Sequence, residues 1–186
     1  PSNSAILYKN DVNYRYFRFV VLTTRGKLDV AKVALFKLYT QDNAWVELEP
    51  CFRKYSSRES REIEGMCNDE SNDDGHIRVG EANGVVLEIS NDQAFGGLMP
   101  KTRTYEWATS YHHGTHDHDP LHWKLQGANT YEQVQDDDWD LLDEQSFVSD
   151  NQSPVPMVRG KFTAKRFSTG DDAFLDPNHT HFVLVR

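Results

Sequence analysis

The sequence predicts an all-β domain, an antiparallel sandwich or barrel, because its apolar segments are short and turn-forming residues separate them. The separating segments, such as "SNDDG", "NDQAFGG", "STGDD" and "LDPN", are rich in Asn, Asp, Gly, Ser and Pro. The clearest strand is 14–24, "YRYFRFVVLTT", with its period of two and its aromatic and β-branched residues. Its two predicted faces are Phe17, Phe19 and Val21 against Tyr14, Tyr16, Arg18 and Val20.

The other elements follow in chain order. Segment 28–40, "LDVAKVALFKLYT", is apolar on both parities, so its composition allows a helix as well as a strand. The only predicted helix is a turn or two within 56–64, "SSRESREIE". With no repeat and no linker, residues 1–186 are expected to form one domain. Further strands are predicted at 84–90, 103–110, 121–127, 139–147 and 180–186, with weaker ones near 44–48, 76–80 and 157–167.

The charge balance limits the classes of partner. The formal net charge of −9 is opposite to the basic surface that binds nucleic acid, and it does not suit docking on anionic lipid. No apolar run reaches the roughly 18 residues that suggest a membrane span. We therefore expect no nucleic acid and no membrane span. The chain begins at Pro1, so processing, or a place in a larger polypeptide or complex, stays open, as does a secreted or organellar location.

Cys51 and Cys67 admit two interpretations. A disulfide between them would stabilise the fold by about 3 kcal/mol through the loop that it closes. The alternative is two unpaired thiols, and the redox state of the compartment decides between the two.

A histidine-rich stretch, "YHHGTHDHDPLHW", spans residues 111–123. On a strand, residues two apart share a face, so His116 and His118 would converge there. No His-Glu-x-x-His or Cys-x-x-Cys signature accompanies them, so surface histidines are the simpler interpretation. A metal-dependent hydrolase using His112, His113, His116, His118 and His122 with Asp117 and Asp119 is the alternative.

A second loop, 68–75, "NDESNDDG", has the oxygen-rich composition that calcium prefers, with Asp73 and Asp74 as candidate ligands. A solvated turn is the competing interpretation. The chain contains no Gly-x-Ser-x-Gly and no phosphate-binding loop. We therefore expect a protein that is not an enzyme, with no certain cofactor and with calcium as an open alternative.

Segment 105–146 resembles the discoidin-like, or coagulation factor 5/8 C-terminal-like, domains, which are galactose-binding-like sandwiches. The resemblance rests on a strand ending in Trp-Ala-Thr, then Asp-Pro-x-x-Trp-x-Leu-x-Gly-Ala-Asn, then a Trp and a Leu-Asp. It implies a jelly-roll β-sandwich of about eight strands with long loops and little helix. The matching residues are Trp107, Ala108, Thr109, Asp119, Pro120, Trp123, Leu125, Gly127, Ala128, Asn129, Trp139, Leu142 and Asp143.

The resemblance also implies a non-catalytic binding role, with a carbohydrate recognised by loops at one end of the sandwich. The alternative is a structural or adaptor subunit that docks on a partner protein through loops and acidic surface. A glycan site should combine an exposed aromatic side chain, an Arg or His, and an Asp or Asn, converging in a shallow pocket. A docking subunit should show a large apolar patch or extended termini buried against partners. The candidate ligand contacts are Tyr111, His112, His113, His116, Asp117 and His118.

Overall fold

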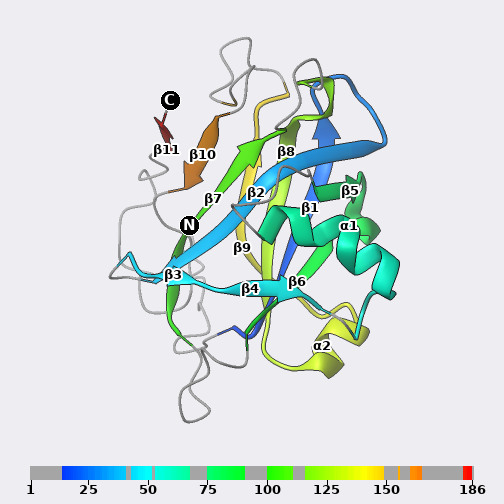
Figure 1. Ribbon diagram of the computed structural model, residues 1–186, viewed down its shortest axis with the longest axis vertical. Coiled ribbons are helices and arrows are strands. Elements are labelled where there is room, and N and C mark those ends of the chain that lie inside the picture. The colour runs from blue at the N-terminus through cyan, green and yellow to red at the C-terminus, as the bar shows by residue number, and fades with distance from the viewer. Residues whose placement is uncertain are drawn as a thin grey trace, which may run out of the picture.

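The computed structural model describes residues 14–40, 43–51, 53–67, 75–90, 100–110, 116–148, 155, 160–164 and 182–185. Within them the chain forms two antiparallel sheets with little helix, which confirms the predicted all-β sandwich class (Figure 1). The helical elements are α1 (Ser57–Cys67), α2 (Tyr131–Gln135) and the 3-10 turns η1 (Glu81–Asn83) and η3 (His116–His118). The strands are β1 (Tyr16–Thr24), β2 (Val30–Thr40), β3 (Trp45–Val46), β4 (Leu48–Pro50), β5 (Gly75–Arg78), β6 (Val85–Ile89), β7 (Thr102–Thr109), β8 (Pro120–Ala128), β9 (Asp140–Ser146), β10 (Lys161–Ala164) and β11 (Phe182–Val185).

One sheet has the order β4-β6-β1-β8-β9, and the other β11-β10-β7-β2-β3, with β5 also paired to β2. The strand count exceeds the expected eight partly because the weak segment 44–48 contains parts of two strands. β3 pairs with β2 in one sheet, and β4 pairs with β6 in the other. The chain therefore crosses between sheets at Glu47. The jelly-roll connectivity expected from the resemblance stays a prediction.

The hydrophobic core lies between the two sheets, where inward side chains of both meet. Trp107 of β7 and Trp123 of β8 are fully buried and pack edge to face, with ring centroids 5.2 Å apart. The ring centroids of Phe19 in β1 and Phe36 in β2 are 5.1 Å apart. Tyr14, predicted with the opposite face of β1, also belongs to this core, because it precedes the strand and packs edge to face on Phe17.

The second face of β1 is covered as well. Tyr16, Arg18 and Val20 are all buried, although they point away from the core between the sheets. The Arg18 guanidinium lies 4.7 Å above the Trp139 ring, and its Nε donates to Gln126 Oε1 at 2.8 Å. A methyl group placed on Gly84 would lie 2.4 Å from Arg18 Cγ, so the loop after η1 rests directly on this arginine.

The ambiguous segment 28–40 is a strand, and a bulge explains its apolar residues on both parities. The pairing of β2 with β7 shifts register between Val33 and Leu35. Ala31 and Val33 face the core before the shift, and Phe36 and Leu38 face it afterwards. The bulge therefore changes the parity of the inward residues.

Helix α1 extends beyond the predicted segment and closes one side of the sandwich, beside β4 and β5 (Figure 1). Ile63 and Met66 insert into the core. The approach to β5 is close, because a methyl group on Gly75 would lie 2.8 Å from Met66 Cβ. Neither described helix has the length and apolar character needed to cross a membrane.

Both cysteines are free thiols, so the structure contains the second of the two alternatives rather than the disulfide. The physical reason is that they belong to different packing groups. Cys51 is buried with Tyr16 and Val86 on the outer side of the five-stranded sheet, whereas Cys67 packs at the end of α1 against the main core.

Candidate ligand-binding site

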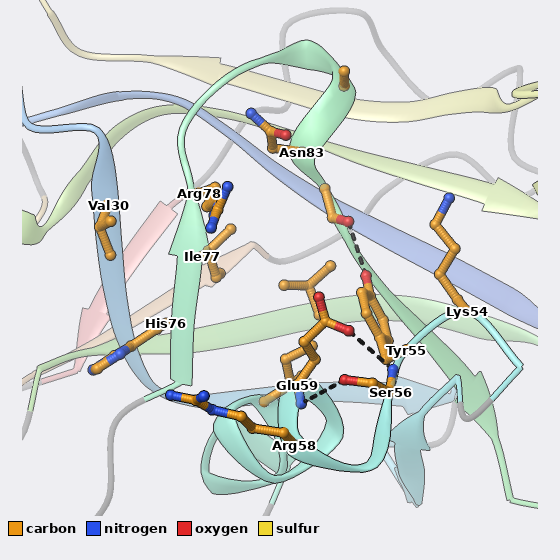
Figure 2. A pocket seen from close by; sticks show the side chains of 14 residues that line it. Val30, Lys54, Tyr55, Ser56, Arg58, Glu59, His76, Ile77, Arg78 and Asn83 are labelled. Atoms are coloured by element: carbon orange, nitrogen blue, oxygen red, sulfur yellow. Dashed lines mark hydrogen bonds between the residues drawn. The ribbon is translucent and has the colours of Figure 1, made fainter.

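The structure has an open cavity of about 810 Å³ between the start of α1, strand β5 and the turn η1. We call it the α1–β5 pocket (Figure 2). It is of the size that binds small organic ligands. Its apolar lining consists of Val30, Tyr55, Ile63, Ile77, Ala82, Gly84 and Val85, and its polar lining of Lys54, Ser56, Arg58, Glu59, His76, Arg78 and Asn83.

The floor of the pocket is rigid because it is part of the core. Ile63, Ile77 and Val85 are each less than 5 % exposed, at 4 %, 1 % and 4 %. Tyr55 is fixed by two hydrogen bonds: its hydroxyl donates to Gly84 O at 3.0 Å and accepts from Val86 N at 2.7 Å. Burial raises the pKa of the Tyr55 phenol to about 12, so the hydroxyl keeps its proton at neutral pH. The floor is a preformed apolar surface with one immobilised aromatic ring.

The rim carries most of the charge. Lys54, Arg58, His76 and Arg78 are exposed side chains that border the cavity. Arg58 extends from α1 toward the start of β5, and Lys54 lies across the pocket beside Tyr55 (Figure 2). The alternation of β5 places His76 and Arg78 on its exposed face, while Ile77 faces the core.

The one acidic side chain among the described lining residues is Glu59, and it caps its own helix. Ser56 N donates to Glu59 Oε2 at 2.9 Å, and Glu59 N donates to Ser56 Oγ at 3.3 Å. This reciprocal pair is a capping box. These hydrogen bonds, with Arg78 nearby, hold the pKa of the Glu59 carboxyl below its usual value. The carboxylate therefore already occupies the N-terminus of α1.

The turn η1 forms the remaining wall. Gly80 precedes it with φ of 126°, a conformation that favours glycine, and its N–H donates to Val21 O at 2.8 Å. The side chain of Asn83 is held by a hydrogen bond from Nδ2 to Val79 O at 3.0 Å. Because η1 is tied to both β1 and the end of β5, this wall is fixed relative to the floor.

The described part of the histidine-rich stretch, residues 116–123, contacts the pocket lining at Val30. Val30 lines the pocket, and its carbonyl oxygen lies 2.7 Å from His118 Nδ1, which therefore carries a proton. His116 and His118 do not share a strand face as expected, because residues 116–118 form the 3-10 turn η3. The carbonyl of Asp117 accepts from Gly26 N at 2.7 Å, which docks this turn on the β1–β2 connection.

Several of the other candidate contacts lie outside the residues that the structure describes. Tyr111, His112 and His113 lie outside the described residues, as do Asp73 and Asp74 of the calcium prediction. His122 Nε2 lies 2.8 Å from Glu144 Oε1 on the neighbouring strand. In the ranges that the structure describes, no group of three or more His, Cys, Asp or Glu side chains is placed to hold a metal ion.

Several residues of the family resemblance lie in β8 or directly beside it. Asp119 and Pro120 are buried at the start of β8, where Arg25 Nε lies 3.6 Å from Asp119 Oδ2. Gly127 is required by packing, because an added methyl group would lie 2.6 Å from the Tyr14 ring. Asn129 N donates to Gln133 Oε1 at 2.9 Å at the start of α2.

The exposed large apolar residues are spread over separate elements. Trp45 of β3 is 50 % exposed and Leu141 of β9 is 55 % exposed. These two strands belong to different sheets. Leu28 and Val148 lie in two further connections. Among the described side chains, the apolar exposure is therefore dispersed.

The sequence contained a partial signal for the pocket that the histidine stretch obscured. The segment "RKYSSRESR" (53–61) gathers basic residues in an acidic chain and includes Lys54 and Arg58. Arg78 and Asn83 join them only through the fold, because β5 returns alongside α1. No protein-family model, curated protein or solved structure matches this chain.

Proposed function

We propose that this chain is a non-catalytic binding domain that recognises a carbohydrate in the α1–β5 pocket. The observation that carries the proposal is an open cavity of about 810 Å³ that joins a rigid apolar floor to a rim of hydrogen-bonding side chains. A sugar ring presents C–H groups on its faces and hydroxyl groups around its edge. A site with apolar surface and a few placed polar groups complements both.

The lining residues support the proposal, because they include the residue types expected of a glycan site. Tyr55, which is half-buried rather than exposed, supplies the aromatic ring, Arg58 and Arg78 supply donors, and Asn83 supplies an amide. Their convergence from α1, β5 and η1 on one cavity is visible in Figure 2. The resemblance of segment 105–146 to galactose-binding-like sandwiches supports the same class of ligand.

The proposal of binding without catalysis rests on the carboxylates. Glycoside hydrolysis generally requires a pair of them, one on each side of the scissile bond. Glu59 is the one carboxylate among the described residues of the pocket, and its Oε2 accepts from Ser56 N. A carboxylate held as a helix cap is poorly placed to transfer a proton to a ligand.

A glycan array probed with the labelled full chain, with calcium and with a chelator, tests this function. We expect a defined set of glycans to bind with or without calcium, because the described lining holds a single carboxylate, that of Glu59, to offer as a calcium ligand. The variant Ala82→Trp places an indole in the pocket without changing its charge, since Ala82 is an exposed lining residue. It should abolish binding, as measured by titration calorimetry.

The matched control is Ala44→Trp, which adds the same indole at an exposed position that does not line the pocket. Its affinity should equal that of the natural chain. An array without binders, or an Ala82→Trp variant that binds normally, would contradict the proposal. Binding that disappears with the chelator would move the site toward Asp73 and Asp74.

A further inference from the structure

We infer that the α1–β5 pocket selects short acidic saccharides, that is, sugars with a carboxylate or sulfate group. This inference rests on the proposed function and specifies its class of ligand. The first observation is that the charge of the pocket lining is opposite in sign to that of the whole chain. The whole chain carries a formal net charge of −9, but the described pocket lining contains three permanently charged cations, Lys54, Arg58 and Arg78, against Glu59.

The single carboxylate does not neutralise this group. Glu59 accepts from Ser56 N at 2.9 Å and is directed to its own helix end. Its electrostatic interaction with Arg78 offsets one of the positive charges. Within the described part of the chain, Lys54 and Arg78 form no ion pair within 4.0 Å. Lys54 and Arg78 alone outnumber the one acidic side chain, Glu59, so the described lining keeps a net positive charge without counting Arg58.

The cations are spread around an apolar floor, which favours a ligand with one or two anionic groups on a neutral body. Arg58 extends from α1 toward the start of β5, Arg78 lies at the end of β5, and Lys54 stands across the cavity (Figure 2). A guanidinium binds a carboxylate or sulfate with two parallel N–H···O bonds. The body of the ligand then lies over Tyr55 and Ile77, where the floor is apolar.

The surroundings disfavour a long polyanion. Glu81 lies on η1, next to the lining residue Ala82, and pairs with Lys124, and Glu64 lies further along α1. The exposed run Asp136–Asp138 follows α2. A chain of repeated negative charges leaving the pocket would meet this acidic surface. A short ligand with one or two anionic groups would avoid that repulsion.

The test is the array described above, stocked with carboxylated, sulfated and neutral glycans, followed by calorimetry. The soluble probes are 3′-sialyllactose, a heparin-derived disaccharide, lactose and sodium sulfate. We expect acidic glycans to dominate the binders, and an acidic probe to bind at least about tenfold more tightly than lactose, which is the effect of one charge-assisted hydrogen bond. Added salt should weaken the binding.

Arg78→Gln and Lys54→Gln should each weaken binding of the acidic probe about tenfold, on the same basis, and leave lactose unaffected. Lys27→Gln removes an exposed cation that does not line the pocket, so it serves as the matched control. All three substitutions are on exposed side chains, and equal thermal unfolding curves would verify that the fold is retained.

The possible outcomes distinguish a failure of the preference for acidic saccharides from a failure of carbohydrate recognition itself. Binders that are mainly neutral, or normal acidic binding by Arg78→Gln and Lys54→Gln, would overturn the inference and leave carbohydrate recognition in place. Binding of sulfate with no binding of any saccharide would overturn both, because the pocket would then hold small anions only. An array without binders would remove the function, and this inference with it.

Discussion

In the middle of the sandwich, polar side chains of three strands form one hydrogen-bonded chain. Trp123 Nε1 donates to Tyr105 OH at 2.9 Å, and Tyr105 OH donates to Asp143 Oδ2 at 2.6 Å. Gln145 Nε2 donates to Asp143 Oδ1 at 2.8 Å. Burial raises the pKa of the Asp143 carboxyl, and the bonds from Tyr105 and Gln145 act in the opposite direction. The chain links the inner side of one sheet to the edge strand of the other.

Tyr105→Phe should lower the free energy of unfolding by about 1–3 kcal/mol, because it removes two hydrogen bonds inside the sandwich, the one from Trp123 Nε1 and the one to Asp143 Oδ2. The measurement is urea denaturation followed by tryptophan fluorescence. Tyr131→Phe is the control: its hydroxyl donates to Arg53 O at an exposed site, and its loss should change stability by less than about 0.5 kcal/mol. Equal losses in the two variants would show that the buried chain adds no stability.

For single residues, the sequence indicated which side chains are buried but not which of them form hydrogen bonds with one another. The alternation in 103–110 and 121–127 favoured core positions for Trp107 and Trp123, and both are fully buried. The Tyr105–Asp143 bond joins residues 38 positions apart. Such a pair depends on the register of both sheets and on their separation, which no local pattern contains.

Helix α1 is defined by its N-terminal cap. The sequence Ser56-Ser57-Arg58-Glu59 is a capping box, and both of its hydrogen bonds are present. The sequence predicted a turn or two of helix within 56–64, and α1 begins inside that segment. The helix continues to Cys67 because Ile63 and Met66 pack into the core. Packing rather than propensity sets its length.

Ser56→Ala should lower stability by about 1 kcal/mol, the usual cost of losing an N-cap side chain. Chemical denaturation gives the total effect, and amide hydrogen exchange should show faster exchange in the first turn of α1. Ser146→Ala, at an exposed position of β9, is the control with little expected change. Unchanged exchange in α1 would mean that packing alone holds the helix start.

Strand β2 shows why the sequence of segment 28–40 allowed a helix as well as a strand. Its apolar residues fall on both parities because the bulge at Val33–Leu35 changes the inward set. Leu35 is itself buried on the opposite face with Ala34 and Ala108. A period-two search assumes one phase for a whole strand. A bulge breaks that assumption without breaking the strand.

Across the whole molecule, buried phenols and thiols make the fold sensitive to alkali. Burial raises the pKa of Tyr55 and of Cys67 to about 12 each. It raises the pKa of Tyr14, Tyr105 and Cys51 as well. The unfolded chain releases these protons near the ordinary pKa values of 9.0 for Cys and 10.0 for Tyr. The folded chain thus binds more protons above pH 9, and stability should fall as the pH rises from there toward 12.

Each such group contributes up to about −1.4 kcal/mol per pH unit to the slope of stability against pH. Tyr55→Phe removes one of them, so the slope between pH 10 and 12 should become shallower, even though the loss of its hydrogen bonds lowers stability at every pH. Guanidinium unfolding at a series of pH values measures both effects. An unchanged slope would show that Tyr55 ionises equally in the folded and unfolded chains.

The α1–β5 pocket is likewise a product of the whole fold rather than of any one element. It needs α1 beside β5 and η1 resting on β1, and these elements meet only when the sandwich is closed. The sequence directed attention to the histidines of 111–123, since unusual composition is visible without a structure. Of the histidines in that stretch, His118 contacts the pocket lining, because its Nδ1 bonds to Val30 O.

By itself, the sequence determined the all-β class, the positions of most strands and the presence of helix within 56–64. These follow from local chemistry: alternation buries one face of a strand, turn residues end it, and Ser56 with Glu59 caps a helix. The tertiary structure alone decided the parity change in β2, the separation of Cys51 from Cys67 and the gathering of Lys54, Arg58 and Arg78 around one cavity. Each of these depends on contacts between segments far apart in the chain, and such contacts are set by packing and register rather than by neighbours in sequence.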